Sequence, residues 1–477
     1  MKIISKKPSW LLFGLILGIS LTFITGEASG ARVKNENAVT VVYLPLTVNN
    51  YPWITSFGTQ VSDFNNPGET NLAIDAGLQW ARMDAFHWGK IEPQNTNAAG
   101  YQWSAVDEAS LITASENGIQ VIGIIRDTPD WAQKNPPYSC GAINQTALPE
   151  FVNFVRELVK RYSVQPYNVK YWEIWNEPDV EPSLVSANSV FGCWGNDQDA
   201  YYGGGYYSQM LNKVYPAIKS VDSTAKVGIG GLLLDCDPTK DRKCRSGKFF
   251  EGLIRSGLPN YGANFDFVSF HGYTPYSSTG GLSLDENHPK WSHRGGIVLG
   301  KLDYLRDVME KFGIDKPILH TEGALTCSEL NPTDCDPPGS DFFEAQADYV
   351  VWLFVRNWAN DVDATIWYQF EGPGWRYSGL LDGTQSPKPA YNALKFLTQE
   401  LRFATYQGRV LENTDTAGYE FSKDDMKVWV LWSPDENPHT VSLPTNAMRA
   451  FDKYGVEIPI TANQITVNSP VYIELPR

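Results

Sequence analysis

Short apolar runs alternate with segments of helical period from about residue 51 to residue 400 of this 477-residue chain. In the segment 148–162, for example, the apolar residues fall on one helical stripe. Eight runs between such segments are rich in β-branched and aromatic residues and predict strands: 53–58, 78–84, 120–126, 169–175, 226–234, 265–271, 317–322 and 363–370. Nearly continuous apolar strands that alternate with helices are typical of a parallel sheet, and eight such strands can close into a barrel.

The sequence therefore predicts an α/β fold, a (β/α)8 TIM barrel, over residues 51–400. A doubly wound open sheet is the alternative, but no GxGxxG follows the first predicted strand. The pattern changes from residue 401 to 477, where alternating and aromatic runs such as GYEFSK and MKVWVLWS are separated by turn residues. These runs predict a small C-terminal antiparallel β-sandwich domain. The stretch 31–50 is interpreted as a linker or as a strand added to that domain.

The first 30 residues have the pattern of a secretory signal peptide. Lys2, Lys6 and Lys7 precede an apolar run at 10–24, and small residues follow. This pattern predicts export and no stable membrane insertion after cleavage. If the segment were not cleaved, it would hold the protein at the cell surface.

Export makes disulfide bonds possible for the six cysteines. Proximity along the chain suggests pairing Cys236 with Cys244, Cys327 with Cys335, and Cys140 with Cys193, although six cysteines allow fifteen connectivities. Metal binding is the competing use of cysteine, but the chain has only six histidines and contains neither CxxC nor HExxH. We therefore expect no bound metal.

Charge excludes one class of partner. The chain carries 54 acidic and 39 basic residues, a formal net charge of −15, which is the wrong sign for binding phosphate backbones. Nucleic acid is therefore not expected as a partner, and we expect a monomer. The 16 tryptophans serve either as core residues or as flat apolar platforms for a ligand.

Candidate chemistry lies where the predicted strands end, because the carboxyl ends of the strands and their following loops form the site of a closed parallel barrel. Asn176 and Glu177 end the fourth strand and Glu322 ends the seventh. The other candidates at strand ends or in the loops beyond them are Arg82, Asp84, Trp131, His271, Tyr273 and Trp367.

Two glutamates on opposite strands fit the hydrolysis of an acetal. One carboxyl group must donate a proton to the leaving oxygen, while the other must be ionised to attack or stabilise the sugar cation. Arg82, Tyr273 and His271 could hold Glu322 ionised, whereas Glu177, without such donors and close to that charge, would keep its proton. Glu177 is thus the expected acid/base and Glu322 the expected nucleophile.

The motifs WNEP at 175–178, HTEG at 320–323, HGY at 271–273 and WARMDAFHWGKIEP at 80–93 resemble the clan A glycoside hydrolases, most closely the family 39 and family 5 types. The resemblance implies a (β/α)8 barrel followed by a β-sandwich, a carbohydrate substrate, and retention of anomeric configuration. It also implies that no metal or organic cofactor is needed.

The same resemblance implies roles for single residues. Glu177 would be the acid/base, Asn176 would bind the sugar 2-hydroxyl, and Glu322 would be the nucleophile. His271, Tyr273 and Arg82 would line the subsite of the glycone, the sugar whose bond is cleaved. Asp179 and the long insertion after the fourth strand depart from the family pattern, which leaves the substrate open.

Other interpretations of these residues remain. Asn-Glu-Pro can be a turn that ends a strand, His271 can be a core histidine, and Arg82 can be an ion-pair partner of Asp84. Trp131 and Trp367, at strand ends, are expected to stack on sugar rings. As alternatives to a retaining β-glycosidase, the chain could be a catalytically idle glycan-binding surface protein or a transglycosidase that uses the same residues.

Overall fold

The computed structural model describes residues 56–96, 98–257, 260–277, 285–327, 335, 337–411 and 415–477. The expected signal peptide at 1–30 and the segment 31–50 lie outside the described residues. No helix in the described part of the chain combines the length and the hydropathy needed to cross a bilayer.

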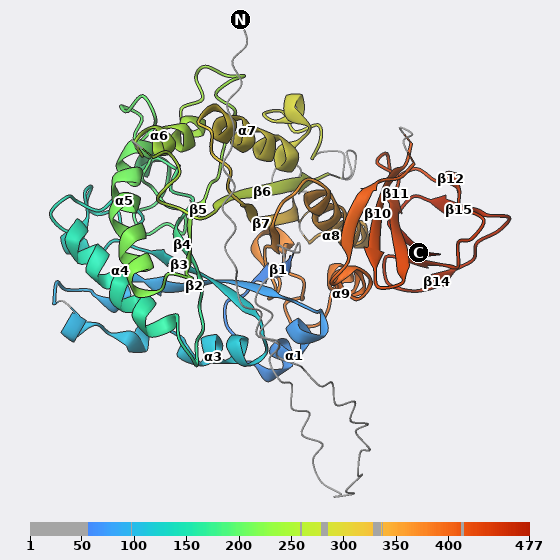
Figure 1. Ribbon diagram of the computed structural model, residues 1–477, viewed down its shortest axis with the longest axis horizontal. Coiled ribbons are helices and arrows are strands. Elements are labelled where there is room, and N and C mark those ends of the chain that lie inside the picture. The colour runs from blue at the N-terminus through green and yellow to red at the C-terminus, as the bar shows by residue number, and fades with distance from the viewer. Residues whose placement is uncertain are drawn as a thin grey trace, which may run out of the picture. The chain divides into compact units, whose positions relative to one another are not determined.

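Eight parallel strands form the predicted TIM barrel (Figure 1). They are β1 (Ser56–Gln60), β2 (Trp80–His87), β3 (Gln120–Arg126), β4 (Tyr171–Asn176), β5 (Lys226–Gly231), β6 (Val268–Tyr276), β7 (Ile318–Cys327) and β8 (Ala364–Trp367). Their order is β5-β4-β3-β2-β1-β8-β7-β6, and single bridges from Gly228 to Phe267 and from Leu232 to Phe270 join the two end strands. Each of the eight strands overlaps a run that the sequence predicted.

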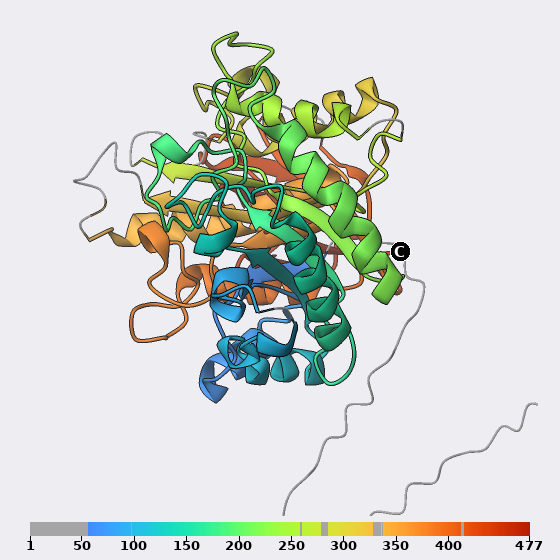
Figure 2. The same cartoon turned by 90° about the vertical axis from the view of Figure 1, so that its left-hand side faces the viewer.

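Helices follow the strands and cover the outer face of the barrel, as Figure 2 shows for α4 and α5. The principal helices are α1 (Pro67–Asp75), α3 (Glu108–Glu116), α4 (Leu148–Tyr162), α5 (Gly204–Val221), α6 (Phe249–Arg255), α7 (Ile297–Lys311), α8 (Ser340–Ala359) and α9 (Pro389–Leu401). In α4 the predicted apolar stripe is wholly buried: Phe151, Phe154, Val155, Leu158 and Val159. Burial of this stripe against the sheet is what stabilises the helix in place.

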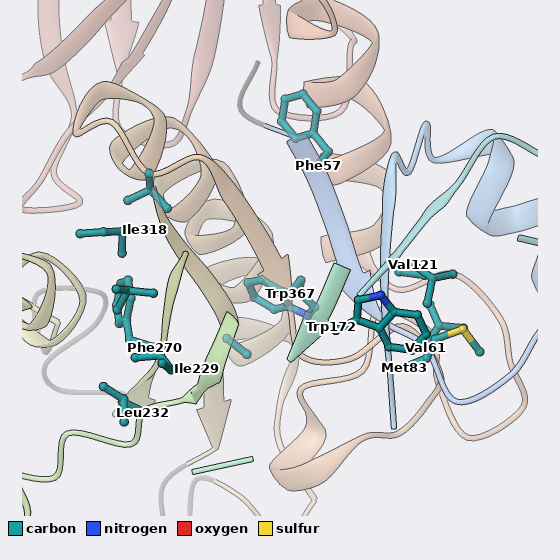
Figure 3. Packing of buried hydrophobic residues seen from close by; sticks show 14 of the residues in the cluster. Phe57, Val61, Met83, Val121, Trp172, Ile229, Leu232, Phe270, Ile318 and Trp367 are labelled. Atoms are coloured by element: carbon teal, nitrogen blue, oxygen red, sulfur yellow. The ribbon is translucent and has the colours of Figure 1, made fainter. Parts of the chain in front are cut away.

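Hydrophobic side chains of the strands and helices form one large buried cluster, and a separate small cluster consists of Trp80, Ile122, Phe267, Leu319, Ala364 and Ile366. Figure 3 shows Val61, Met83, Trp172, Phe270 and Trp367 among the buried side chains of the large cluster. Such a core fixes the strands relative to one another, so that side chains at their carboxyl ends are held in one place.

The C-terminal strands form the predicted antiparallel β-sandwich. A six-stranded sheet has the order β14-β13-β16-β11-β10-β9, and a two-stranded sheet pairs β12 with β15. The strands are β9 (Thr405–Arg409), β10 (Ala417–Lys423), β11 (Met426–Trp432), β12 (His439–Ser442), β13 (Arg449–Asp452), β14 (Glu457–Ile458), β15 (Gln464–Val467) and β16 (Val471–Pro476). Trp432 stacks on Trp352 of α8 at a centroid distance of 5.6 Å, so the sandwich packs on the barrel's helices.

All three predicted disulfide bonds are present. They join Cys140 to Cys193, Cys236 to Cys244, and Cys327 to Cys335, and they use all six cysteines. Each of them joins cysteines that lie at or beyond the carboxyl end of a barrel strand. The bonds therefore stiffen the rim on which the candidate site lies.

Candidate active site

A pocket of about 240 Å³ opens at the carboxyl ends of the barrel strands. Five of the residues expected to act in catalysis or sugar binding line it: Arg82, Asn176, Glu177, Tyr273 and Glu322. The remaining lining residues are Gln60, Asp84, Ile124, Val190, Phe191, Tyr368 and Trp375. The structure thus brings together, from β2, β4, β6 and β7, the polar side chains that the strand-end argument selected.

Glu322 lies in β7 between two donors. Arg82 Nη1 donates to Glu322 Oε1 at 2.5 Å, and the hydroxyl of Tyr273 donates to Oε2 of the same carboxylate. Burial raises the pKa of Glu322 above its ordinary value, and the charge of Arg82 and the hydrogen bond from Tyr273 oppose this rise. Of the two glutamates, Glu322 is the one whose charge is compensated, so we assign the ionised form to it.

The guanidinium of Arg82 is fully buried and bound on every side. Its Nε donates to Glu173 at 2.6 Å, Nη1 also donates to Gln60 at 2.6 Å, and Nη2 donates to Asn176 at 2.6 Å. Glu173 is itself buried and accepts hydrogen bonds from two hydroxyl groups, those of Ser269 and Thr321. This network fixes the direction of the cation toward Glu322.

Glu177 follows the last residue of β4 in a left-handed backbone conformation with φ of 45°. Its amide nitrogen donates to Gly231 O at 2.9 Å, which holds this turn against the end of β5. Burial, then the negative charges of Glu322 and Asp179, raise the pKa of Glu177 well above its ordinary value. Glu177 is therefore the carboxyl group of the pair that keeps its proton.

His271 lies between the two carboxylates. Its position corrects the expectation that Glu177 lacks a hydrogen-bonding side chain beside it. Its Nδ1 is 2.7 Å from Glu177 Oε1 but 3.4 Å from Glu322 Oε2, so Glu177 does have a hydrogen-bond partner. Burial, with the charge of Arg82 as the next cause, lowers the pKa of His271 well below its ordinary value, and the ring is neutral. A Cβ at Gly231 would lie 2.0 Å from His271 Nε2, so only glycine leaves room for this ring.

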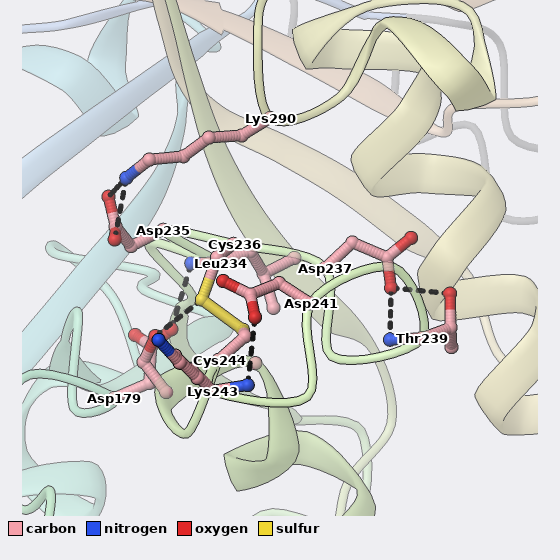
Figure 4. The surroundings of a disulfide bond; sticks show 12 residues. Asp179, Leu234, Asp235, Cys236, Asp237, Thr239, Asp241, Lys243, Cys244 and Lys290 are labelled. Atoms are coloured by element: carbon pink, nitrogen blue, oxygen red, sulfur yellow. Dashed lines mark hydrogen bonds and ion pairs between the residues drawn. A yellow bond between two sulfur atoms is a disulfide. The ribbon is translucent and has the colours of Figure 1, made fainter.

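Asp179, which departs from the family pattern, lies just behind Glu177. Its carboxylate accepts from the amide nitrogens of Leu233 and Leu234 at 2.9 and 2.8 Å. Figure 4 shows it beside Leu234 and the disulfide between Cys236 and Cys244. Burial raises the pKa of Asp179 to about 6, against the effect of these amides. An ionised Asp179 would add to the negative field that keeps Glu177 protonated.

The two glutamates lie close together. One ligand atom from each of Glu177, His271 and Glu322 lies within 4.8 Å of the others, which places a carboxylate oxygen of each glutamate within that distance. The same spacing would suit a metal ion, with the three side chains as ligands. A divalent cation would there have to compete with Arg82, which already binds Glu322.

No protein-family model matches the sequence, and no curated protein matches it. Several solved structures are similar to the structure of this chain. A family 39 glycoside hydrolase from Bacteroides cellulosilyticus WH2 has a TM-score of 0.64 at 18% identity, covering 88% of this chain and 81% of that one. The family 30 subfamily 8 xylanase Xyn30A from Clostridium acetobutylicum has a TM-score of 0.57 at 13% identity, covering 89% and 96%.

A conserved exported protein from Bacteroides fragilis has a TM-score of 0.61 at 13% identity, covering 89% of this chain and 98% of that one. The chain has the fold of these glycoside hydrolases. At such low identity the likeness establishes the fold, and the chemistry of this chain has to be argued from its own side chains.

The alternative interpretation of Arg82, as an ion-pair partner of Asp84, is wrong. Asp84 is bound by Arg126, whose Nε and Nη2 reach its two oxygens at 2.7 and 2.5 Å. Arg82 instead faces Glu173 and Glu322. Asp84 lines the pocket, where its fixed carboxylate can accept hydrogen bonds from a ligand.

The two tryptophans predicted as platforms do not line the pocket. Trp367 is fully buried and its Nε1 donates to Ser378 O at 2.8 Å, so it is a core residue. Trp131 packs edge-to-face on Trp88 and donates to the carbonyl oxygen of Glu92 at 3.3 Å.

Other aromatic residues line the pocket instead of those tryptophans. Tyr368, Trp375 and Phe191 line the pocket, and none of them was predicted to stack on the sugar. Tyr368 follows the predicted Trp367 directly, and successive residues of a strand point to opposite faces. Alternation at the end of β8 therefore predicts that Tyr368, and not Trp367, points into the pocket. Trp375 and Phe191 lie in loops without a period, and no sequence signal marks them.

Proposed function

We propose that the protein is a secreted glycoside hydrolase that cleaves β-glycosidic bonds with retention of configuration. The observation that carries the proposal is the pair of buried carboxyl groups, Glu177 and Glu322, which lie within 4.8 Å in one pocket but differ in surroundings. Retaining enzymes place the two groups about 5–5.5 Å apart, whereas inverting enzymes leave roughly 6.5–9.5 Å for a water molecule. The short separation supports retention.

In the first step Glu177 donates its proton to the glycosidic oxygen while the carboxylate of Glu322 attacks the anomeric carbon. The bond to the leaving group breaks, an alcohol departs, and a glycosyl ester forms on Glu322. In the second step Glu177, now ionised, removes a proton from water, which attacks the anomeric carbon and releases Glu322. Glu177 thereby regains its proton.

The neighbouring side chains serve these two steps. Arg82 and Tyr273 keep Glu322 ionised before attack and stabilise its charge when the ester breaks. Asn176, held by Arg82 and by the carbonyl oxygen of Val190, is in position to bind a sugar hydroxyl beside the bond that breaks. The three disulfides support an oxidising, extracellular location.

Two variants test the proposal. Glu322→Gln should remove turnover of para-nitrophenyl β-glycosides without lowering the melting temperature. Glu177→Ala should lose most activity, and azide should partly restore turnover of substrates with good leaving groups and yield β-glycosyl azide. Normal turnover by Glu322→Gln would refute the assignment, and α-glycosyl azide would show that the anomeric configuration is not retained.

A further inference from the structure

Among the described residues, three exposed apolar side chains line the catalytic pocket. Val190, Phe191 and Trp375, which we call the apolar rim, line the pocket and are exposed by 65%, 39% and 44%. They make up three of the ten most exposed large apolar side chains among the described residues. Single exposed apolar residues are ordinary, but their gathering at one pocket indicates a binding surface.

The apolar rim is formed from opposite sides of the barrel. Phe191 lies in the loop after β4 and Trp375 in the loop after β8, and three strands separate β4 from β8 in either direction around the sheet. A group that protrudes from the pocket would therefore pass between the two aromatic side chains.

Both sides of the rim are held by residues of the catalytic pocket. Asn176 donates its Nδ2 to the carbonyl oxygen of Val190 at 3.1 Å, and the amide of Gly192 donates to Asn176 O. The disulfide from Cys193 to Cys140 fixes the end of the same loop. Trp375 packs edge-to-face on Tyr273 at a centroid distance of 5.1 Å. The rim is thus preorganised, which lowers the entropy lost on binding.

The interior and the mouth of the pocket suit different chemistries. The interior presents Gln60, Asp84 and Asn176 to a ring that carries hydroxyl groups, and the volume of about 240 Å³ is small for a ligand pocket. A second sugar at the mouth would bring hydroxyl groups against Val190 and Phe191, which offer no side-chain hydrogen-bond partner. An aromatic ring at the mouth would have no such cost and would gain contact with Phe191 and Trp375.

We propose that the protein acts on glycosides of a single sugar joined to an apolar, aromatic aglycone, and that Phe191 and Trp375 bind this aglycone. The inference rests on the proposed glycosidase function and extends it to the leaving group. The cleaved bond remains the glycosidic bond, and the aglycone departs as a phenol or aryl alcohol that carries the proton from Glu177.

The test compares leaving groups on one sugar. A panel of para-nitrophenyl β-glycosides first identifies the sugar with the highest kcat/KM. Phenyl 1-thio-glycoside, methyl 1-thio-glycoside and the S-linked disaccharide of that sugar are then measured as competitive inhibitors. We expect the phenyl compound to bind about tenfold more tightly than either of the others.

Two variants test whether Phe191 and Trp375 cause the preference for the phenyl compound. Phe191→Ala and Trp375→Ala should each weaken the phenyl compound by about fivefold to tenfold and leave the methyl compound within about twofold. Leu184→Ala is the matched control, because Leu184 lies in the same loop and is 70% exposed but does not line the pocket. Melting temperatures of all variants should stay close to that of the parent protein.

The outcomes separate the two proposals. Equal affinity for the phenyl and methyl compounds, or tightest binding of the disaccharide, would refute the aromatic aglycone while the glycosidase remains. Tightest binding of the disaccharide, weakened by Trp375→Ala, would show that the rim is a second sugar subsite. If β-linked polysaccharides are hydrolysed but no para-nitrophenyl glycoside is, the inference fails while the glycosidase remains. If neither kind of substrate is hydrolysed, the proposed function fails as well.

Discussion

Glu173 offers a sharp test of the electrostatics because it shares the guanidinium of Arg82 with Glu322. Its negative charge is one of the causes that raise the pKa of Glu322. The variant Glu173→Gln keeps the shape of the side chain and an oxygen that can accept from Arg82 Nε. It removes one charge and leaves the other three acceptors of Arg82 in place.

The size of the effect follows from Coulomb's law. Two carboxylates on one guanidinium lie roughly 5–7 Å apart, and at an effective dielectric constant of about 20 they repel by about 2–3 kcal/mol. Since one pKa unit corresponds to about 1.4 kcal/mol, loss of this repulsion should lower the pKa of Glu322 by about 1–2 units. The ionised form of Glu322 would then persist at lower pH.

The assay is the pH dependence of kcat/KM. Its acidic limb reports ionisation of Glu322 in the free enzyme and its basic limb reports loss of the proton from Glu177. Glu173→Gln should move the acidic limb to lower pH by about 1–2 units. Glu92→Gln is the matched control, because Glu92 is also buried but binds the indole of Trp88. An acidic limb that stays in place or moves to higher pH would refute the coupling through Arg82.

Three further predictions concern the buried side chain of Trp367, the position of the His271 ring and the need for a metal ion. Trp367→Ala should lower the unfolding free energy by about 3–5 kcal/mol in a denaturant titration, because the side chain is fully buried. Tyr368→Ala should mainly raise KM. The reverse pattern would show that Trp367, and not Tyr368, belongs to the site. Gly231→Ala should displace the His271 ring and lower kcat by about tenfold or more while the protein stays folded, and a parental kcat would contradict this packing. Dialysis against a chelator should leave kcat/KM unchanged. A loss that a divalent cation restores would show that activity needs a metal, for which Glu177, His271 and Glu322 are the candidate ligands.

Most of the barrel could be predicted from the sequence because its strands are buried on both faces and therefore appear as continuous apolar runs. The carboxyl ends of β6 and β7 could not be predicted from the sequence. Both strands continue past His271 and Glu322 and pair with each other as far as Tyr276 and Cys327. That pairing depends on a partner strand distant in the sequence, and local hydrophobicity does not report it.

The site could be predicted as far as strands position it. Glu177 directly follows β4, whereas Arg82, Tyr273 and Glu322 lie within β2, β6 and β7. The rule that parallel strands share one rim was still enough to predict that these side chains come together. The apolar rim could not be predicted in this way, because its residues belong to loops. The error at Trp367 was a displacement by one residue, which in a strand moves a side chain from one face to the other.

The central claim is that Glu322 attacks the sugar while Glu177 supplies the proton. The most direct measurement is mass spectrometry of the protein after incubation with an activated 2-deoxy-2-fluoro-β-glycoside of the preferred sugar, followed by digestion and peptide sequencing. The account predicts one glycosyl group per protein, attached to Glu322, and no labelling of the Glu322→Gln variant. A label on any other residue, or turnover without any trapped intermediate, would contradict it.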